Sequence, residues 1–327
     1  MKNTIILCHG DCDGMTSGAI ALAANPGARI WLTRPIQLDD DLKKIKQKYD
    51  KIIITDIALN EKDYNETFQE MKRLKKLGSE IIYIDHHPLP AGIKKKDIPA
   101  TTTIHRQDAC AAELTYLHFE DKLSWEYKIL AAIGAVGDYE MDTLFAQEVM
   151  NDYDARSISF QAAIIVQALG EIPGVDEMKM KRSIIERLAL GVLPSELNDL
   201  VDKALRGSQV EKSVRKFVHE NAKHKKLIGY ILDIPTGGGF KGKGALFAAT
   251  ATDKPVGVCG NSYSDNISMS LRRRDENYNL NIAVRKAAKE VGGSGGGHPS
   301  AAGARIKKSK WTKFLDLLDF ELKKQEK

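Results

Sequence analysis

The feature that most constrains this chain is the alternation, over its first 85 residues, of short apolar runs with longer amphipathic stretches. Each run has the length of a β-strand and is apolar at every position, which is typical of strands covered by helices on both faces. Each amphipathic stretch is long enough for a helix that connects two parallel strands. The sequence therefore predicts a parallel sheet with strands at 4–8, 30–33, 52–55 and 81–84.

Beyond this region the pattern changes twice. Residues 108–205 contain stretches with helical periodicity, and the highly charged residues 206–225 predict a connecting helix or linker. Strand-like runs return at 227–234, 245–251, 256–259 and 267–271, followed by helices at 280–291 and 311–323 that flank a glycine-rich loop at 292–297. We therefore expect an α/β chain in which a parallel-sheet domain with a helical extension (1–205) is joined by a linker (206–225) to a smaller α+β domain (226–327).

The charge is divided unequally along the chain. The net charge is +5, but residues 206–327 carry +12 and residues 1–205 carry −7. A basic domain beside an acidic one suits a polyphosphate substrate and a metal-binding carboxylate site, although a basic face can also be ordinary solvated surface. The longest uncharged apolar run, 129–137, is too short for a membrane span, and no secretory signal is recognisable, so we expect a cytoplasmic protein without membrane contact.

Potential metal ligands follow three of the four predicted strands. A single aspartate after a strand is more often a turn former or helix N-cap, but three such strand ends favour a site at the edge where parallel strands place their carboxyl ends. Asp138, after the apolar helix that ends near residue 137, is either a further ligand or a turn residue. The residues at the strand ends are His9, Asp11 and Asp13, then Asp56, and then Asp85, His86 and His87.

Carboxylates mixed with imidazoles suit Mn(II), Mg(II) or Fe(II), whereas a structural zinc site would favour thiolates. The set is large enough for two ions. Paired metals about 3.5–4 Å apart activate water and stabilise both the attacking and the leaving oxygen in phosphoryl transfer. The residues themselves therefore favour hydrolysis of a phosphate ester or anhydride.

The Asp-His-His triplet at 85–87, with its acidic partners at family-like separations, resembles the signature of the DHH phosphoesterase superfamily. The segment 292–303, with the pattern Gly-Gly-Gly-His-x-x-Ala-Ala-Gly, resembles the signature of the DHH-associated C-terminal domain. The two signatures occur in the family's order and together cover essentially the whole chain. The resemblance implies a catalytic domain and a substrate-binding domain, with the active site in the cleft between them.

The resemblance also implies a role for each residue. Asp56 would bridge two metal ions, and Asp85 and His87 would be catalytic groups beside them, Asp85 by orienting an imidazole and His87 by contacting a phosphate oxygen. One ion would be bound by His9, Asp11 and Asp56, and the other by Asp13, Asp56, His86 and Asp138.

In the second domain the resemblance assigns phosphate contacts to an arginine at a strand end and to the glycine-rich segment. Consecutive glycine N–H groups can form an anion-binding nest, and an arginine can bind phosphate through two hydrogen bonds. The residues so implied are Arg272, Gly295, Gly296, Gly297 and His298.

The short His-x-Asp-x-Asp spacing is similar to RecJ-type exonucleases, and the long glycine run is similar to archaeal RecJ-like nucleases, whereas nanoRNases usually have a longer spacing. We therefore expect an exonuclease with two Mn(II) ions, or Mg(II) instead, that degrades single-stranded DNA or RNA to mononucleotides. A phosphodiesterase for cyclic di-AMP, very short oligonucleotides or 3′-phosphoadenosine phosphate is the alternative, and a non-catalytic replication scaffold is a remote one. The expected partners are single-stranded nucleic acid or short oligonucleotides, and a helicase or another replication or repair protein.

Overall fold

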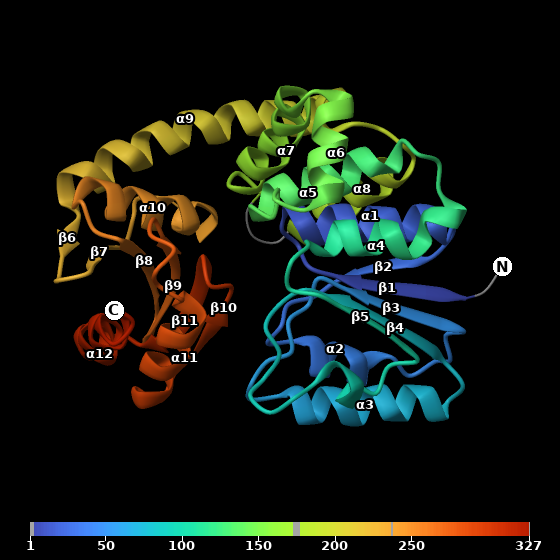
Figure 1. Ribbon diagram of the computed structural model, residues 1–327, viewed down its shortest axis with the longest axis horizontal. Helices are drawn as coiled ribbons and strands as arrows, with labels where there is room; N and C mark the ends of the chain where they lie inside the picture. Colours follow the sequence, from blue (N-terminus) through green and yellow to red (C-terminus); the bar gives the residue numbers. More distant parts are fainter. Residues whose placement is uncertain (1–2, 173–176, 237, 327) are drawn as a thin grey trace. The chain divides into compact units, whose positions relative to one another are not determined.

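The structure is a computed structural model that describes residues 3–172, 177–236 and 238–326. Residues 1–2, 173–176, 237 and 327 of the expected domains lie outside the described residues. The chain divides into two compact units, Met1–Ala204 and Leu205–Lys327 (Figure 1). The expected fold class, a parallel-sheet unit with a helical region followed by a smaller mixed-sheet unit, is confirmed. None of the helices described is both long and apolar enough to cross a lipid bilayer.

The first unit is built on a five-stranded parallel sheet in the order β2-β1-β3-β4-β5. Four strands match the expected runs. The fifth, β5, was missed because its sequence, Thr-Thr-Ile-His, is half-buried and lacks the apolar signal of the others. The strands are β1 (Thr4–Cys8), β2 (Arg29–Leu32), β3 (Lys51–Thr55), β4 (Glu80–Asp85) and β5 (Thr102–His105).

Helices cover both faces of this sheet (Figure 1). α2 (Leu38–Lys44) and α3 (Tyr64–Lys76) lie on one face, and their apolar side chains form one core with the strands. The opposite face is covered by a helical layer with its own core, which contains the expected helical extension. The helices of this layer are α1 (Cys12–Ala24), α4 (Ala111–Phe119), α5 (Tyr127–Asp138), α6 (Leu144–Tyr153), α7 (Ala155–Leu169) and α8 (Glu177–Ala189).

The register of the sheet aligns the carboxyl ends of its three central strands. Cys8 of β1 pairs with Thr55 of β3, and Thr55 pairs with Ile84 of β4. The residue that follows each of these three belongs to the candidate site. The pairing of the strands is therefore what brings distant parts of the sequence to one edge.

The second unit contains a six-stranded sheet in the order β10-β11-β9-β8-β7-β6, in which the pair β7 and β8 is parallel and the other pairs are antiparallel. One face packs against α10 and part of α9, and the other against α11 and α12. The elements are α9 (Asn198–Asn221), β6 (Lys223–His224), β7 (Ile228–Leu232), α10 (Lys241–Ala251), β8 (Val256–Tyr263), β9 (Asn266–Arg273), α11 (Leu280–Glu290), β10 (Ser294–Gly297), β11 (Ala301–Lys307) and α12 (Trp311–Lys323).

Three details of this unit differ from the expectation or refine it. Residues 245–251, expected as a strand, belong to helix α10, because the run is rich in alanine, a strong helix former, and contains no valine or isoleucine. The glycine-rich loop at 292–297 contains strand β10, which pairs with the unexpected strand β11. Residues 206–221 continue helix α9, whose Val214 and Val218 are buried in a core of the second unit, together with α10.

Candidate metal centre

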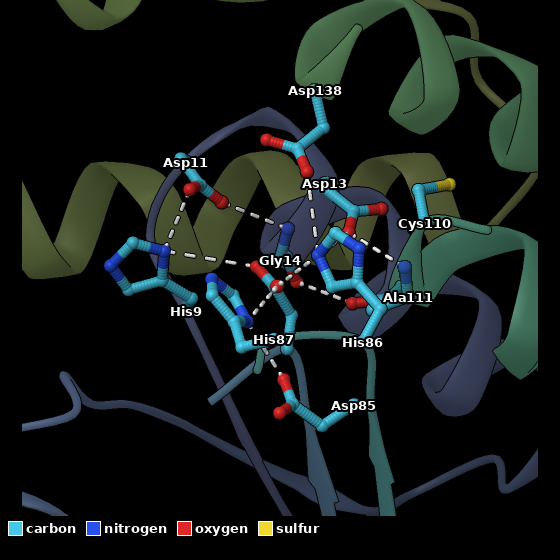
Figure 2. A network of polar contacts seen from close by, with 12 residues as sticks. His9, Asp11, Asp13, Gly14, Asp85, His86, His87, Cys110, Ala111 and Asp138 are labelled. Carbon is cyan, nitrogen blue, oxygen red and sulfur yellow. Dashed lines mark hydrogen bonds and ion pairs between the residues drawn. The ribbon is translucent and has the colours of Figure 1, made fainter. Parts of the chain in front are cut away.

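The structure brings together all eight residues of the first unit that the sequence singled out. All of them except Asp56 are labelled in Figure 2. The eight residues lie on four segments: the loop after β1 with the first turn of α1, the residue after β3, the end of β4 with the two residues that follow, and the last residue of α5. In chain order they are His9, Asp11, Asp13, Asp56, Asp85, His86, His87 and Asp138.

One cluster of three carboxylates surrounds His86. The Nε2 atom of His86 lies 3.6 Å from Asp13 Oδ2, 3.5 Å from Asp56 Oδ1 and 3.3 Å from Asp138 Oδ2. The imidazole of His86 is almost completely buried, as are the side chains of Asp13 and Asp56. This arrangement of one nitrogen and three carboxylate oxygens is a donor set for a hard divalent cation.

A second cluster lies on the other side of Asp56. The Nδ1 atom of His9 is 2.8 Å from Asp11 Oδ2 and 3.7 Å from Asp56 Oδ2. Asp56 has a left-handed backbone with φ of 58°, which aspartate tolerates better than most residues, and its N–H donates to the carbonyl of Ile84 on β4. The two carboxylate oxygens of Asp56 therefore face two different clusters.

His87 and Asp85 form a pair beside these clusters. The Nδ1 atom of His87 lies 2.9 Å from Asp85 Oδ1, and the hydroxyl of Tyr83 donates to Asp85 Oδ2 at 3.1 Å. Burial lowers the pKa of His87, but the Asp85 carboxylate outweighs this effect and raises the pKa to about 9. His87 is therefore cationic at neutral pH, and the ring of His105 contacts its backbone carbonyl at 2.8 Å.

The helix N-termini hold two of the carboxylates in place. Asp11 is the N-cap of α1 and accepts a hydrogen bond from the N–H of Gly14 at 3.0 Å. Asp13 accepts hydrogen bonds of 2.8 Å from the N–H groups of both Ala111 and Ala112, in the first turn of α4. These two donors were not foreseen, because nothing in an alanine pair distinguishes it from any other helix start.

Two glycines permit this close packing. A Cβ atom on Gly14 would lie 2.8 Å from Asp56 Oδ2, and one on Gly134 would lie 2.8 Å from Asp13 Oδ1. Neither position has room for a side chain, since neighbouring atoms that close would have to move. The small residues of α5 are the sequence signal for this contact, which the spacing of the charged residues does not reveal.

The electrostatics of the cluster favour a bound cation. Burial and, as a smaller cause, neighbouring carboxylates raise the pKa of Asp13 to about 6 and those of Asp56 and Asp138 well above their usual range. Burial lowers the pKa of His86 to about 3, so its imidazole is neutral and has a lone pair to offer. Divalent cations offset the repulsion between the carboxylates, so these residues fit the two metal ions that the family resemblance implies.

The implied substrate residues of the second unit lie at or near one end of strands β9 and β10. Arg272, near the end of β9, donates from Nη1 to the carbonyl of Leu271 and lies against Gly242 in the first turn of α10. Gly295, Gly296 and Gly297 form strand β10 rather than a loop, and His298 follows them, with its N–H bonded to the carbonyl of Ala301.

Two polar residues of α11 accompany the glycine strand and were not foreseen. The N–H of Gly297 donates to Asn281 Oδ1 at 3.2 Å, and a Cβ atom on Gly296 would lie 3.2 Å from Arg285 Nε. Both residues are part of the amphipathic pattern of a helix, which gave no separate signal for them. The roles of Arg272 and the glycine strand in substrate binding remain a prediction.

Comparison of folds identifies similar solved structures. RecJ from Thermus thermophilus in complex with Mn²⁺ has a TM-score of 0.69 and 16% identity, and the match covers 99% of this chain and 52% of that one. A manganese-bound exonuclease RecJ has a TM-score of 0.64 and 16% identity over 98% of this chain and 90% of that one. The pGpG-specific phosphodiesterase PggH of Vibrio cholerae has a TM-score of 0.58 and 14% identity over 99% of this chain and 100% of that one. This chain therefore spans about half the length of the Thermus thermophilus RecJ, and at these identities the likeness shows the fold alone.

The family comparison covers both units. The N-terminal domain of the DHH family matches residues 3–155, and the DHHA1 domain matches residues 246–324. No curated protein matches the sequence at a significant level. The expectation from the sequence signatures is confirmed: this chain contains a DHH family N-terminal domain followed by a DHHA1 domain.

Proposed function

We propose that this chain is a two-metal phosphodiesterase that hydrolyses single-stranded DNA or RNA from an end to mononucleotides. The observation that carries the proposal is the position of Asp56, whose Oδ1 faces His86 and whose Oδ2 faces His9. A carboxylate shared between two donor clusters is the arrangement required to hold two cations near each other. The likeness to RecJ structures that contain Mn²⁺ or Mg²⁺ supports the same choice of metals.

Each cluster would hold one ion. His9, Asp11 and Asp56 would hold the first, and Asp13, Asp56, His86 and Asp138 the second. When bound, such ions supply Lewis-acid charge to a phosphate and lower the pKa of water. The protein fixes their ligands through the helix N-termini and the aligned strand ends.

His87 would act on the phosphate itself. It is held by Asp85 and is cationic at neutral pH, so it can donate a hydrogen bond to a phosphate oxygen that gains negative charge as the bond breaks. Asp85 is fully buried and would keep the imidazole in its orientation. The second unit, whose residues carry a net charge of +12 from 206 onward, would bind the phosphates of the strand through Arg272 and the segment from Gly295 to His298.

A second candidate function is the hydrolysis of very small nucleotides. The match to the pGpG-specific phosphodiesterase PggH covers all of that chain, whereas RecJ of Thermus thermophilus is about twice as long as this chain. The same metal ligands would serve both reactions, and cyclic di-AMP or 3′-phosphoadenosine phosphate belongs to the same substrate class. A non-catalytic scaffold would be expected to have lost metal ligands, and all six are present here.

The length dependence of turnover tests the proposal. Single-stranded DNA and RNA of 2 to 20 nucleotides would be digested with Mn(II), with a chelator as one control and Asp56→Asn, which keeps the shape of the side chain, as another. We expect faster turnover beyond about five nucleotides, because a strand-binding surface engages several phosphates and bases. Turnover restricted to dinucleotides or cyclic dinucleotides would favour the second candidate, and full activity of Asp56→Asn would contradict both.

A further inference from the structure

Tyr139, the residue directly after Asp138, has a backbone conformation that tyrosine rarely adopts. It ends helix α5 with φ of 62° and ψ of 24°, in the left-handed region. The turn is fixed by two hydrogen bonds, from the N–H of Tyr139 to the carbonyl of Val136 and from the N–H of Glu140 to the carbonyl of Ala135. This motif normally has glycine at the left-handed position, because a side chain there is sterically disfavoured.

The chain itself uses glycine at the corresponding place elsewhere. Left-handed glycines follow α3, α8 and α11, at Gly78, Gly191 and Gly292. Among the described residues, the other non-glycines with positive φ are aspartates and one serine, small polar residues that are easier to accommodate. Tyr139 is therefore the one aromatic residue in this group, and glycine would form the same turn at lower energy.

Packing does not account for the tyrosine. The Tyr139 side chain is 68% exposed, whereas Tyr83, which supports Asp85 in the same site, is fully buried. An aromatic residue that remains largely exposed gains little hydrophobic stabilisation to offset a disfavoured backbone. Strained residues persist near functional sites when the strained feature is used there.

The place of Tyr139 in the chain points to its use. The carboxylate of Asp138, the preceding residue, lies 3.3 Å from His86 in the candidate metal centre, and the two hydrogen bonds of the turn hold Tyr139 in a fixed relation to it. An exposed aromatic residue next in the chain to a candidate ligand of a phosphodiester-cleaving site would be suited to a nucleobase, since every base has a π-face that stacks on such a ring. Stacking of this kind is tolerant of base identity, as an enzyme that digests a strand requires.

We propose that Tyr139 is a base-stacking residue, which holds the heterocycle of the nucleotide next to the bond being cut. The inference rests on the proposed function, because it assumes a nucleotide substrate at the metal centre. It adds to that function a contact with the base, whereas the metals, His87 and Arg272 would contact phosphate.

The test compares Tyr139→Gly and Tyr139→Phe with Ser264→Gly, which relieves a left-handed residue (φ of 51°) in the turn between β8 and β9. Each protein is assayed with Mn(II) on a single-stranded 10-mer and on the same strand lacking the base at one end or the other. We expect Tyr139→Gly to raise KM on the normal strand about 10-fold, the effect of one lost stacking contact, and to match the wild type on one of the abasic strands. Tyr139→Phe keeps the ring and should keep the low KM, and Ser264→Gly should leave KM unchanged.

Stability and metal binding separate this role from a structural one. Tyr139→Gly should have a thermal midpoint equal to or above that of the wild type and an unchanged Mn(II) affinity by calorimetry. A lower midpoint, or a KM equal to that of the wild type on the normal strand, overturns the inference. If the wild type cleaves no strand, the proposed function fails and the inference with it; if it does cleave and Tyr139→Gly behaves identically, only the inference fails.

Discussion

The substitution Gly134→Ala tests how closely the packing of α5 on α1 is coupled to the metal centre. The added methyl group would lie 2.5 Å from the Cβ atom of Ala112, 2.7 Å from Thr16 Oγ1 and 2.8 Å from Asp13 Oδ1. None of these atoms belongs to a flexible side chain with room to move. Thr16 is bonded to the carbonyl of Cys12, and Asp13 to the N–H of Ala112.

Three contributions determine how much Gly134→Ala lowers the free energy of unfolding. Overpacking in a well-filled core costs about 1–3 kcal/mol. Displacing Asp13 weakens a buried hydrogen bond, at a further cost of about 1–3 kcal/mol, and the better helix propensity of alanine returns about 1 kcal/mol. The free energy of unfolding should therefore fall by about 1–5 kcal/mol, which at about 2–4 °C per kcal/mol corresponds to roughly 2–20 °C in the thermal midpoint of a unit of this size.

The effect on metal binding distinguishes coupling from simple destabilisation. A shifted ligand typically costs about 10- to 100-fold in metal affinity, and we expect this loss in a calorimetric titration of Gly134→Ala with Mn(II). Gly18→Ala is the matched control, because its methyl group would lie 2.8 Å from Cys8 Sγ and touch no carboxylate. It should destabilise the unit but leave Mn(II) affinity intact. Equal Mn(II) affinity in the two variants, or wild-type stability of Gly134→Ala, would refute the reasoning.

Three further predictions concern protons, the phosphate and the strand. Mn(II) affinity should increase between pH 5 and 7, because burial raises the pKa of Asp13 to about 6 and binding must displace its proton. The raised pKa of Asp13 also makes the metal-free fold lose stability as pH rises from about 4 through 6. The difference between the melting midpoints with and without Mn(II) should therefore widen over that range. A constant difference would contradict the assignment of Asp13 as a metal ligand. His87→Ala should keep its Mn(II) affinity, measured by calorimetry, but its kcat in steady-state kinetics should fall by about 10²- to 10⁴-fold. Loss of Mn(II) binding in this variant would instead show that His87 is a metal ligand. Arg272→Ala should bind a 20-mer more weakly, and the slope of its log affinity against log salt concentration should be about 0.7 shallower. Unchanged affinity and slope in anisotropy titrations would show that Arg272 does not contact phosphate.

The sequence was sufficient for the metal-ligand candidates because their positions depend on topology. Parallel strands must present their carboxyl ends at one edge, so the residues after β1, β3 and β4 had to converge whatever the details of packing. Asp138 was the exception, since it follows a helix and the structure is needed to show that α5 ends beside His86. The family signature, and not the residue pattern, placed it in the set.

What sequence reasoning missed depends on backbone groups and on residues with little side chain. The N–H donors of Ala111 and Ala112 are available at any helix start, so no residue type indicates them. The glycine run was expected as a loop because glycine gives no periodic signal, yet a Cβ atom on Gly295 would lie 3.0 Å from the carbonyl oxygen of Gly303 on the neighbouring strand, so glycine is needed there. The same limitation made α10, rich in small residues, look like a strand.

The helix N-termini explain how the first unit can keep so many carboxylates close together before a cation binds. Four backbone N–H groups point from the start of any helix, with a partial positive charge that stabilises an anion within the first turn. α1 directs its N-terminus at Asp11 and α4 directs its own at Asp13, so two of the carboxylates are stabilised by the fold. Asp56 bonds no helix N-terminus in the described chain, and its pKa is raised well above the usual range by burial and by its neighbours. It follows that the residue shared by the two clusters depends on the metal for its ionised form, and a cation that binds there should displace a proton.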